Sequence, residues 1–547
     1  PSISGSPLDC WYEGNPSDVY RNTFDRNSFP NSNSNNGVPS LLEIKNFSKR
    51  SARMTLSVNV GNNVARPITK LSKSVGASSS DNSPQLVDNA IFVSKGDSIY
   101  AFQVNGKSSV PDSTGLFSQV GGRFPVAANV AQALGPRYIL GVKDSSVYVF
   151  SPVDATLDSV YESIPVTVVN LGKRITTPVS IHFTTSYQAL VGDAGGAVTS
   201  VNLPPAGVPP SVAVSSAPIQ SLISGSGTWY ATSSERIYKQ SGERYNFTSP
   251  SSGFSAGSAQ FIAVVDTVGR SILFFDPNLN LLKIVSIASY KGPATQPVIA
   301  DVNRDGNQEL LMTAGNMLLA FNKSGFFLDG FPSRLREGTN RTSSLVLRDM
   351  NGDDDIDIVL VTDRGVVQVV NSKGKVLEDL SVDVGETVST SPLLFSNSGS
   401  IGFNVATQSG LLRAWVYSST YNGLNTLWQG FSKDAGHSNF AVPYSGAISA
   451  LSASFLPRDR VYNWPNPVYG NTTNVRYYVS ENADVSIRIF DLAGAQVAEI
   501  LGKAQAGVDG EVPWDVSNIQ SGIYLARIEA VGTSKTDVAV IKIAVVK

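Results

Sequence analysis

Pro297–Gly325, PVIADVNRDGNQELLMTAGNMLLAFNKSG, and Leu345–Gly374, LVLRDMNGDDDIDIVLVTDRGVVQVVNSKG, share one plan. Each stretch begins with a short apolar run, passes through an acidic turn, and continues in further apolar runs separated by a Gly-bearing turn. Short β-branched and aliphatic runs between Asn, Asp and Gly turns are typical of strands joined by hairpins. The two stretches therefore predict neighbouring copies of one antiparallel sheet.

Less regular copies of this plan occur along most of the chain. They begin at Pro84, Tyr138, Ala189, Thr228, Phe261 and Pro392. Their spacing of about 35 to 50 residues is in the range of propeller blades, and a closed ring of blades protects sheet edges. The sequence thus predicts a β-propeller of seven or eight blades between about Asn62 and Ala447. The alternative, a row of separate sandwiches, would require Pro-rich linkers that are not obvious here.

The regions on either side of the repeats differ from them. A hairpin pattern from Leu41 follows an Asn- and Ser-rich loop, and a Pro-bearing linker begins at Leu456. We predict an all-β chain with a β-rich N-terminal segment over residues 1–62, which could be the remnant of an upstream domain. The propeller covers residues 63–455, and a small immunoglobulin-like sandwich covers residues 456–547.

Composition narrows the class of protein. Of the 547 residues only 16% are charged, and the formal net charge is -2, so no electrostatic attraction for nucleic acid is expected. Cys10 is the only cysteine, which excludes an intrachain disulfide, and we expect no role for it. No apolar run is long enough for a transmembrane helix, and the N-terminus lacks a signal-peptide pattern, as expected of a processed fragment. We expect an extracellular protein or glycan as partner, or self-assembly.

Two acidic turns occupy matching places in the two stretches quoted above. Oxygen-bearing side chains at alternate positions of a tight turn can converge on one point, which suits a hard cation such as Ca²⁺. Gly306 permits a sharp bend in the first turn, whereas Asp354 must adopt a left-handed or strained backbone in the second. The alternative is an ordinary solvated turn. The predicted calcium ligands are Asp301, Asn303, Asp305, Asn307 and Glu309, and Asp349, Asn351, Asp353, Asp355 and Asp357.

The two turns resemble the calcium loops of integrin-like FG-GAP repeats. They have the forms D-x-N-x-D-G-x-x-E over Asp301–Glu309 and D-x-N-G-D-x-D-x-D over Asp349–Asp357. The resemblance implies a structural ion that fixes a hairpin of the blade, without the vacant position that a catalytic metal requires.

The last domain resembles the FlgD-like immunoglobulin domain that serves as a type IX secretion sorting tail. The resemblance implies a sandwich with a turn at Gly494 and a core Trp514, either cleaved after secretion or retained as a tether. The matching residues are Asn463, Pro465, Asn466, Pro467, Val485, Ile487, Ile489, Asp491, Gly494, Trp514, Asp515, Ser521, Gly522 and Tyr524.

A fainter resemblance covers Asp9–Val60, which is similar to the segment after the catalytic domain of immune inhibitor A metallopeptidases. The H-E-x-x-H motif of that family is absent, and His182 and His437 are the only histidines, so we predict no zinc site and no Ser-His-Asp triad. We predict a secreted, non-catalytic interaction or structural protein at the cell surface, for instance in adhesion. The alternatives are the non-catalytic C-terminal part of a metallopeptidase precursor, a propeller hydrolase or lyase that uses carboxylates, and a glycan-binding propeller with Trp229, Tyr230 and Trp415 stacked on sugars.

Overall fold

The computed structural model describes most of the chain, in ranges separated by gaps. These ranges are 11–16, 22–35, 37–61, 65–67, 73–74, 83–87, 90–95, 98–103, 131–133, 138–150, 166–248, 253–336, 344–362, 364–388, 390–397, 399–420, 426–430, 432–434, 437–442, 455–456, 461–506, 509–533 and 535–547. The chain divides into a propeller unit, Pro1–Lys323 with Pro332–Gly446, and a C-terminal unit, Ser324–Phe331 with Ala447–Lys547.

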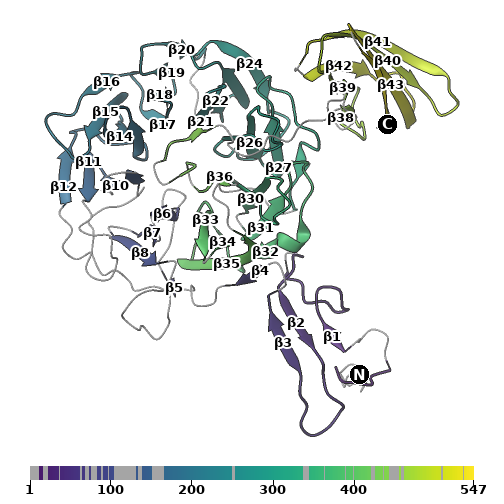
Figure 1. The fold of residues 1–547 in the computed structure, drawn as a ribbon, viewed down its shortest axis with the longest axis horizontal. Helices are drawn as coiled ribbons and strands as arrows, with labels where there is room; N and C mark the ends of the chain where they lie inside the picture. The colour runs from purple at the N-terminus through teal and green to yellow at the C-terminus, as the bar shows by residue number, and fades with distance from the viewer. Residues whose placement is uncertain are drawn as a thin grey trace. The chain divides into compact units, whose positions relative to one another are not determined.

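The propeller unit is a ring of antiparallel sheets, as predicted (Figure 1). Within the described residues, eight sheets follow one another along the chain; the blade number of the complete ring stays a prediction. The first four sheets contain β6 Gln85–Val87, β7 Ala90–Lys95 and β8 Ser98–Gln103; β9 Ala131–Ala133, β10 Tyr138–Lys143, β11 Ser146–Phe150 and β12 Val166–Asn170; β13 Ser180–Phe183, β14 Tyr187–Gly192, β15 Ala197–Asn202 and β16 Ser211–Ala213; β17 Ile219–Gly225, β18 Thr228–Ser233, β19 Arg236–Lys239 and β20 Arg244–Asn246.

The next four sheets have the same order, and the two quoted repeats form two of them. They contain β21 Gly253–Ser258, β22 Ile262–Asp266, β23 Ser271–Phe275 and β24 Leu281–Ser286; β25 Val298–Ala300, β26 Glu309–Ala314, β27 Met317–Phe321 and β28 Ser333–Arg334; β29 Val346–Arg348, β30 Asp357–Val361, β31 Val366–Val370 and β32 Val382–Asp383; β33 Leu393–Asn397, β34 Ser400–Ala406 and β35 Leu411–Thr420. The short 3₁₀ turn η5, Glu378–Leu380, is the one helix among the described residues.

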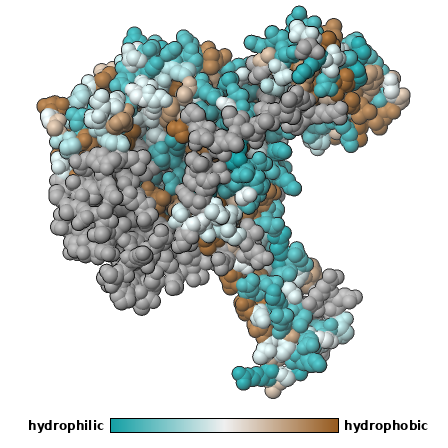
Figure 2. Space-filling view, in the orientation of Figure 1, coloured by the Kyte–Doolittle hydropathy of each residue, from teal (hydrophilic) through white to brown (hydrophobic). Residues whose placement is uncertain are grey.

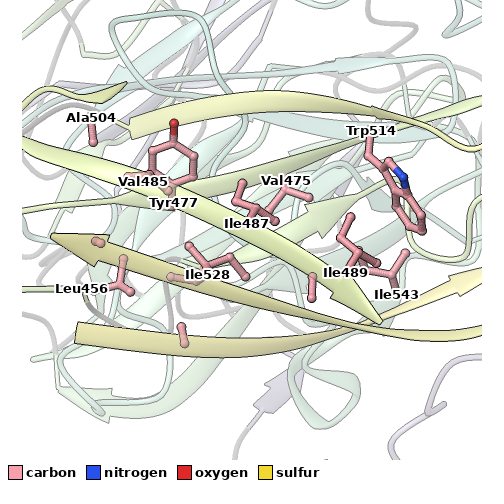
Figure 3. Packing of buried hydrophobic residues seen from close by; sticks show 14 of the residues in the cluster. Leu456, Val475, Tyr477, Val485, Ile487, Ile489, Ala504, Trp514, Ile528 and Ile543 are labelled. Carbon is pink, nitrogen blue, oxygen red and sulfur yellow. The ribbon is translucent and has the colours of Figure 1, made fainter. Parts of the chain in front are cut away.

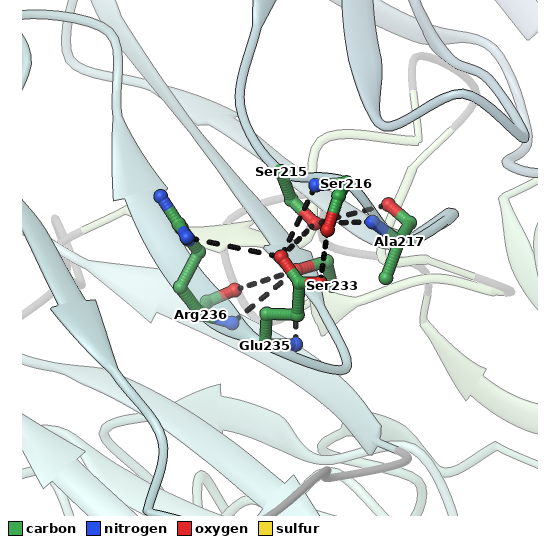
Figure 4. A network of polar contacts seen from close by, with 6 residues as sticks. All are labelled: Ser215, Ser216, Ala217, Ser233, Glu235 and Arg236. Atoms are coloured by element: carbon green, nitrogen blue, oxygen red, sulfur yellow. Dashed lines mark hydrogen bonds and ion pairs between the residues drawn. The ribbon is translucent and has the colours of Figure 1, made fainter.

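Neighbouring blades are joined by apolar stacking and by side-chain hydrogen bonds. The ring of Phe274 in β23 lies 5.8 Å from that of Phe261, which directly precedes β22, and 6.4 Å from that of Phe321 in the next sheet. Between the third and fourth sheets, Glu235 accepts hydrogen bonds from Ser215 Oγ and the Ser216 amide, both at 3.1 Å (Figure 4). Hydrogen bonds from the Ser216 hydroxyl and the Ser216 amide, and to a smaller extent from Ser215, lower the pKa of the Glu235 carboxyl. The Glu235 carboxylate therefore links the turn after β16 to the turn between β18 and β19.

The ring is closed by residues that are far apart in sequence. β4, Ala65–Pro67, pairs with β35 and supplies the outer strand of the last sheet, with Ala65 opposite Tyr417 and Pro67 opposite Trp415. The short strand β5, Lys73–Ser74, pairs with β35 as well. Closure of this kind satisfies the backbone groups of an edge strand that would otherwise be exposed.

Residues 426–430, 432–434 and 437–442 lie inside the ring, and we call them the central segment. It contains β36, Thr426–Trp428, which pairs with β29, and β37, Phe440–Ala441, which pairs with β21 (Figure 1). Gln429 exchanges hydrogen bonds of 3.0 Å with Leu394 of β33 through its carbonyl and its side-chain amide. Asn439 Nδ2 donates to the carbonyl of Leu222 in β17 at 3.0 Å. The central segment thus holds the innermost strands of several blades together.

The C-terminal unit is a sandwich of two antiparallel sheets with an alternating core. Along β40 the residues Val485, Ile487 and Ile489 are buried while those between them are not, as predicted from their spacing (Figure 3). Trp514 is buried in the same core, as predicted, and packs edge to face against Tyr524. The strands are β38 Tyr462–Trp464, β39 Thr472–Tyr478 and β42 Asp509–Asp515 in one sheet, and β40 Ala483–Phe490, β41 Gln496–Ala504, β43 Gly522–Gly532 and β44 Thr536–Val545 in the other.

Asn466, Asp491 and Gly494 of the predicted motif have structural roles in this unit. Asn466 donates from Nδ2 to the Lys542 carbonyl at 2.8 Å and accepts from the Ala544 amide at 2.9 Å. Asp491 Oδ1 accepts from the amides of Ala493 and Ala495, and Gly494 in this turn has φ 85°. The motif residues therefore close turns and tie strand ends together.

Candidate metal centre

The first acidic loop joins β25 to β26, and its side chains accept hydrogen bonds from its own backbone. Asp301 accepts from the amides of Asp305 and Gly306, at 3.0 and 2.9 Å. Asn303 Oδ1 accepts from the Asp305 amide at 3.1 Å, and Asp305 Oδ1 accepts from the Asn307 amide at 2.7 Å. The loop is thus a series of side-chain-to-backbone turns that ends at the buried Glu309.

The second acidic loop joins β29 to β30 and has similar hydrogen bonds, most of them at equivalent positions. Asp349 differs because it accepts from the Gly352 amide, where Asp301 accepts from the Asp305 amide. Asp349 accepts from the amides of Gly352 and Asp354, at 2.7 and 3.1 Å. Asn351 Oδ1 accepts from the Asp353 amide at 3.1 Å, and Asp353 Oδ1 accepts from the Asp355 amide at 2.9 Å. Asp354 has φ 67° where Gly306 has φ 83°, so the left-handed backbone expected at this position is present.

The carboxylates that begin the second strand of each sheet are equivalent too. Glu309 Oε2 accepts from the Val302 amide at 3.0 Å, and Asp357 Oδ2 accepts from the Met350 amide at 2.9 Å. Both side chains are essentially inaccessible to solvent. Asp357 Oδ1 is buried as well and has no hydrogen-bond partner among the described residues. A buried carboxylate oxygen without a partner is costly, and a bound cation is one means of satisfying it.

Burial changes the acidity of two of these carboxyl groups. It raises the pKa of Asp301 to about 6, and the charge of Asp305 acts in the same direction. Burial raises the pKa of Asp357 to about 7, with further contributions from the charges of Asp353, Asp349 and Asp355. The loops therefore concentrate negative charge at positions where it is poorly solvated.

The two loops lie beside each other. Arg304 Nη1 of the first loop is 3.9 Å from Asp354 Oδ1 of the second. Gln260, at the turn between β21 and β22, donates from Nε2 to the Gly306 carbonyl at 2.9 Å and accepts from the Gln308 amide at 3.1 Å. The sequence predicted equivalent loops but not these links, which come from neighbouring blades.

The oxygen-rich side chains suit Ca²⁺ in kind, but they do not enclose a point in this structure. Among the described residues, no three His, Cys, Asp or Glu side chains are gathered closely enough to hold a metal ion. The carboxylates instead face the amides of their own loops. Calcium at these residues stays a prediction, supported by the chemistry of the donors and by the unsatisfied oxygen of Asp357.

Both histidines are buried, His182 in β13 and His437 within the central segment. His182 Nδ1 lies 2.9 Å from Ser224 Oγ, and His437 Nδ1 lies 3.0 Å from the Val179 carbonyl. Burial lowers the pKa of both rings, that of His437 to about 4. Cys10 lies outside the described residues.

The aromatic residues considered for sugar binding do not fit that role. Trp229 and Tyr230 are each 2% exposed and Trp415 is 6% exposed, so no sugar ring can stack on them. Trp229 packs against Tyr238 and Trp415 against Phe403. Their role is core packing, the alternative that their alternation with strand residues also allowed.

Comparison with known proteins identifies the C-terminal unit. Residues 462–542 match the secretion system C-terminal sorting domain. The chain therefore carries a type IX sorting tail, and the protein is secreted, to the exterior or to the cell surface. Among the described residues we find no helix with the length and apolarity needed to cross a membrane.

Solved structures similar to this chain are propeller-like and distant in sequence. Sqt1 of Saccharomyces cerevisiae has 13% identity and a TM-score of 0.49 over 63% of this chain and 97% of its own. The WD40 propeller domain of Doa1 has 15% identity and a TM-score of 0.35 over 52% and 92%. BamB from Moraxella catarrhalis has 14% identity and a TM-score of 0.31 over 53% and 96%. No curated protein sequence matches, and the resemblances to FG-GAP repeats and to immune inhibitor A stay predictions.

Proposed function

We propose that this chain is a secreted, non-catalytic interaction or structural module whose propeller is stabilised by calcium at the two acidic loops. The observation that supports it best is the buried carboxylate of Asp357, with one oxygen unsatisfied, in a loop equivalent to its neighbour. Ca²⁺ prefers carboxylate, amide and carbonyl oxygens, which are the groups that both loops supply. Its charge would offset the repulsion among Asp349, Asp353 and Asp357.

The central segment limits where a partner could bind. Because the central segment pairs with the innermost strands β21 and β29, the faces and outer strands of the blades are the surfaces that we propose for a partner. An extracellular protein, a glycan or another copy of the chain would then be held by loops around the ring. The sorting tail would deliver this surface to the outside of the cell.

The test compares thermal unfolding in calcium with unfolding in a chelator, together with metal analysis of the untreated protein. A ligand present at about a hundred times its Kd stabilises a protein by about 2.7 kcal/mol, which is a shift of several degrees. We expect this shift in the wild type and bound calcium without zinc. No calcium and no shift would refute the proposal and return the carboxylates to consideration as catalytic groups.

Two variants separate metal binding from ordinary turn stability. Asp357→Asn removes the buried charge and keeps an acceptor for the Met350 amide, so we expect it to match or exceed the wild type in chelator and to lose most of the calcium shift. Asp276 supplies the matched control, since its Oδ1 accepts from the amides of Asn278 and Asn280 in a turn outside both loops. Asp276→Asn should leave the calcium shift unchanged.

A further inference from the structure

The N-terminal sheet has an apolar face that is covered on one side and open on the other. Its strands are β1, Thr23–Phe24, β2, Leu42–Lys45, and β3, Ser57–Val60, in this order. Pairing places Phe24, Ile44 and Val58 in one row across the sheet, and therefore on one face. Trp11 packs on this face against Phe24, with ring centroids 5.7 Å apart.

The exposed part of this apolar face lies along β3. Val58 and Val60 lie in β3 and Leu56 directly precedes it, and these alternate residues are 58, 54 and 50% exposed, respectively. Three aliphatic side chains at alternate positions with this exposure form a continuous apolar strip, unlike the isolated apolar residues common on surfaces. We call these three residues the apolar strip.

The backbone of β3 is unpaired on the same side of the sheet. β3 is an edge strand in the part of the chain that the structure describes. The Gly61 amide donates to the Leu41 carbonyl at 2.7 Å. From this pair on, hydrogen-bonded and non-hydrogen-bonded residue pairs alternate between β3 and β2. In an antiparallel ladder this places the amides and carbonyls of Val58 and Val60 on the outer edge, away from β2. An edge of this kind is a template for an added strand.

The turn that leads into β3 is strongly basic. Lys49, Arg50 and Arg53 are exposed, and no ion pair joins them to another described residue. Lys45 differs because it is paired with Glu43 at 2.8 Å. Figure 2 shows hydrophilic residues at the tip of this hairpin and hydrophobic residues along it. We call Lys49, Arg50 and Arg53 the basic tip.

We propose that the outer edge of β3 binds an extended segment of a partner protein, apolar at alternate positions and acidic at the end that lies beside the basic tip. The segment would pair antiparallel to β3, so that its carboxyl end meets the tip. Its amides and carbonyls would bond those of Val58 and Val60, its apolar side chains would extend the strip, and its carboxylates would pair with the three cations.

The alternatives fit these observations less well. Lipid chains would leave the outward amides and carbonyls of Val58 and Val60 without partners, which is costly in an apolar phase. A second copy of β3 would bring a basic tip and no carboxylate to the strip. A polypeptide strand with terminal acidic residues satisfies the backbone, the apolar strip and the basic tip together.

The test uses a fluorescent peptide of alternating valine and threonine that ends in three glutamates, with the full-length chain as receptor. We expect saturable binding with a Kd below about 1 mM, weakened by added salt because exposed ion pairs are screened. The same peptide ending in three lysines should bind at least about tenfold more weakly. Calcium is held constant throughout, so a failure here says nothing against the metal proposal.

Three variants assign the binding to this edge. Val58→Pro removes an outward amide that β2 does not use, and Val58→Lys puts a charge on the strip while leaving the backbone intact; each should weaken binding by about tenfold or more. Arg50→Glu should do the same, whereas Arg244→Glu, an exposed arginine of β20, should have no effect. Absence of binding, or binding that none of the Val58 and Arg50 variants weakens, would overturn the proposal. So would a concentration-dependent dimer that Val58→Pro abolishes, or binding to phosphatidylglycerol vesicles in place of the peptide.

Discussion

Arg304 of the first acidic loop and Asp354 of the second form an ion pair between neighbouring blades, with 3.9 Å between Nη1 and Oδ1. The Arg304 side chain is 8% exposed and that of Asp354 is 83% exposed. Both residues have a positive φ, 56° and 67°, so each loop places a side-chain-bearing residue in a backbone conformation that glycine adopts more easily. The pair shows that the loops form one structural region.

Replacement of Asp354 by glycine should stabilise the propeller slightly. The backbone strain at φ 67° is relieved, while the amide that donates to Asp349 is kept. Relief of this strain is worth up to about 1 kcal/mol, and an ion pair with one exposed partner contributes less. Urea unfolding in chelator should show an unchanged or higher midpoint for Asp354→Gly. A loss of about 1 kcal/mol or more would mean that the contact with Arg304 outweighs the strain.

Replacement of Gly225 by alanine should destabilise the contact between β17 and Phe440 of the central segment. A Cβ at this position would lie 2.2 Å from Cγ of Phe440, far inside van der Waals contact. Overpacking of this kind costs about 1 to 3 kcal/mol. Thermal unfolding should show the loss, and combining the variant with Phe440→Ala should make Gly225→Ala nearly neutral. Gly470→Ala, with open space around its Cβ, is the control.

Lowering the pH should destabilise the propeller partly through His437. The pKa of His437 is about 4 in the folded chain because burial disfavours the cation, against 6.5 for an unperturbed ring. Between these values the unfolded chain binds a proton that the folded chain does not, so the free energy of unfolding falls as the pH falls. The loss approaches roughly 3 kcal/mol below pH 4 and is absent above about pH 7.

The measurement is urea unfolding at pH 7 and pH 4.5 for the wild type and for His437→Gln. Because the variant lacks the titrating ring, its midpoint should change less between the two pH values. An equal change in both proteins would show that other groups account for the pH dependence.

Truncation of Trp514 should unfold the sorting domain selectively. Its ring is buried in the core of the sandwich against Tyr524. Trp→Ala in a core costs about 3 to 5 kcal/mol, a large part of the stability of a small domain. Calorimetry of the full chain should show the transition of the C-terminal unit at lower temperature and that of the propeller unchanged. A shift of both transitions would contradict this prediction.

Features that depend on residues close together in the chain could be predicted from the sequence. Alternation of apolar residues in β40 placed Val485, Ile487 and Ile489 in a core, because successive side chains of a strand point to opposite faces. Turn chemistry identified the left-handed position of Asp354 in the same way. The sorting tail was recognisable because its Asn, Pro and Gly residues close local turns at fixed spacings.

Features that join residues distant in the chain could not be predicted and were found in the folded structure. The pairing of Ala65 with Tyr417, the central segment beside β21 and β29, and the contact of Arg304 with Asp354 all depend on closure of the ring. No local sequence pattern predicts these contacts. Each residue fits the pattern of its own strand or turn whether or not its distant partner is present. For the same reason the burial of Trp229 and Trp415 could not be predicted from the sequence. Their exposure depends on the neighbouring blade and on the strands around them.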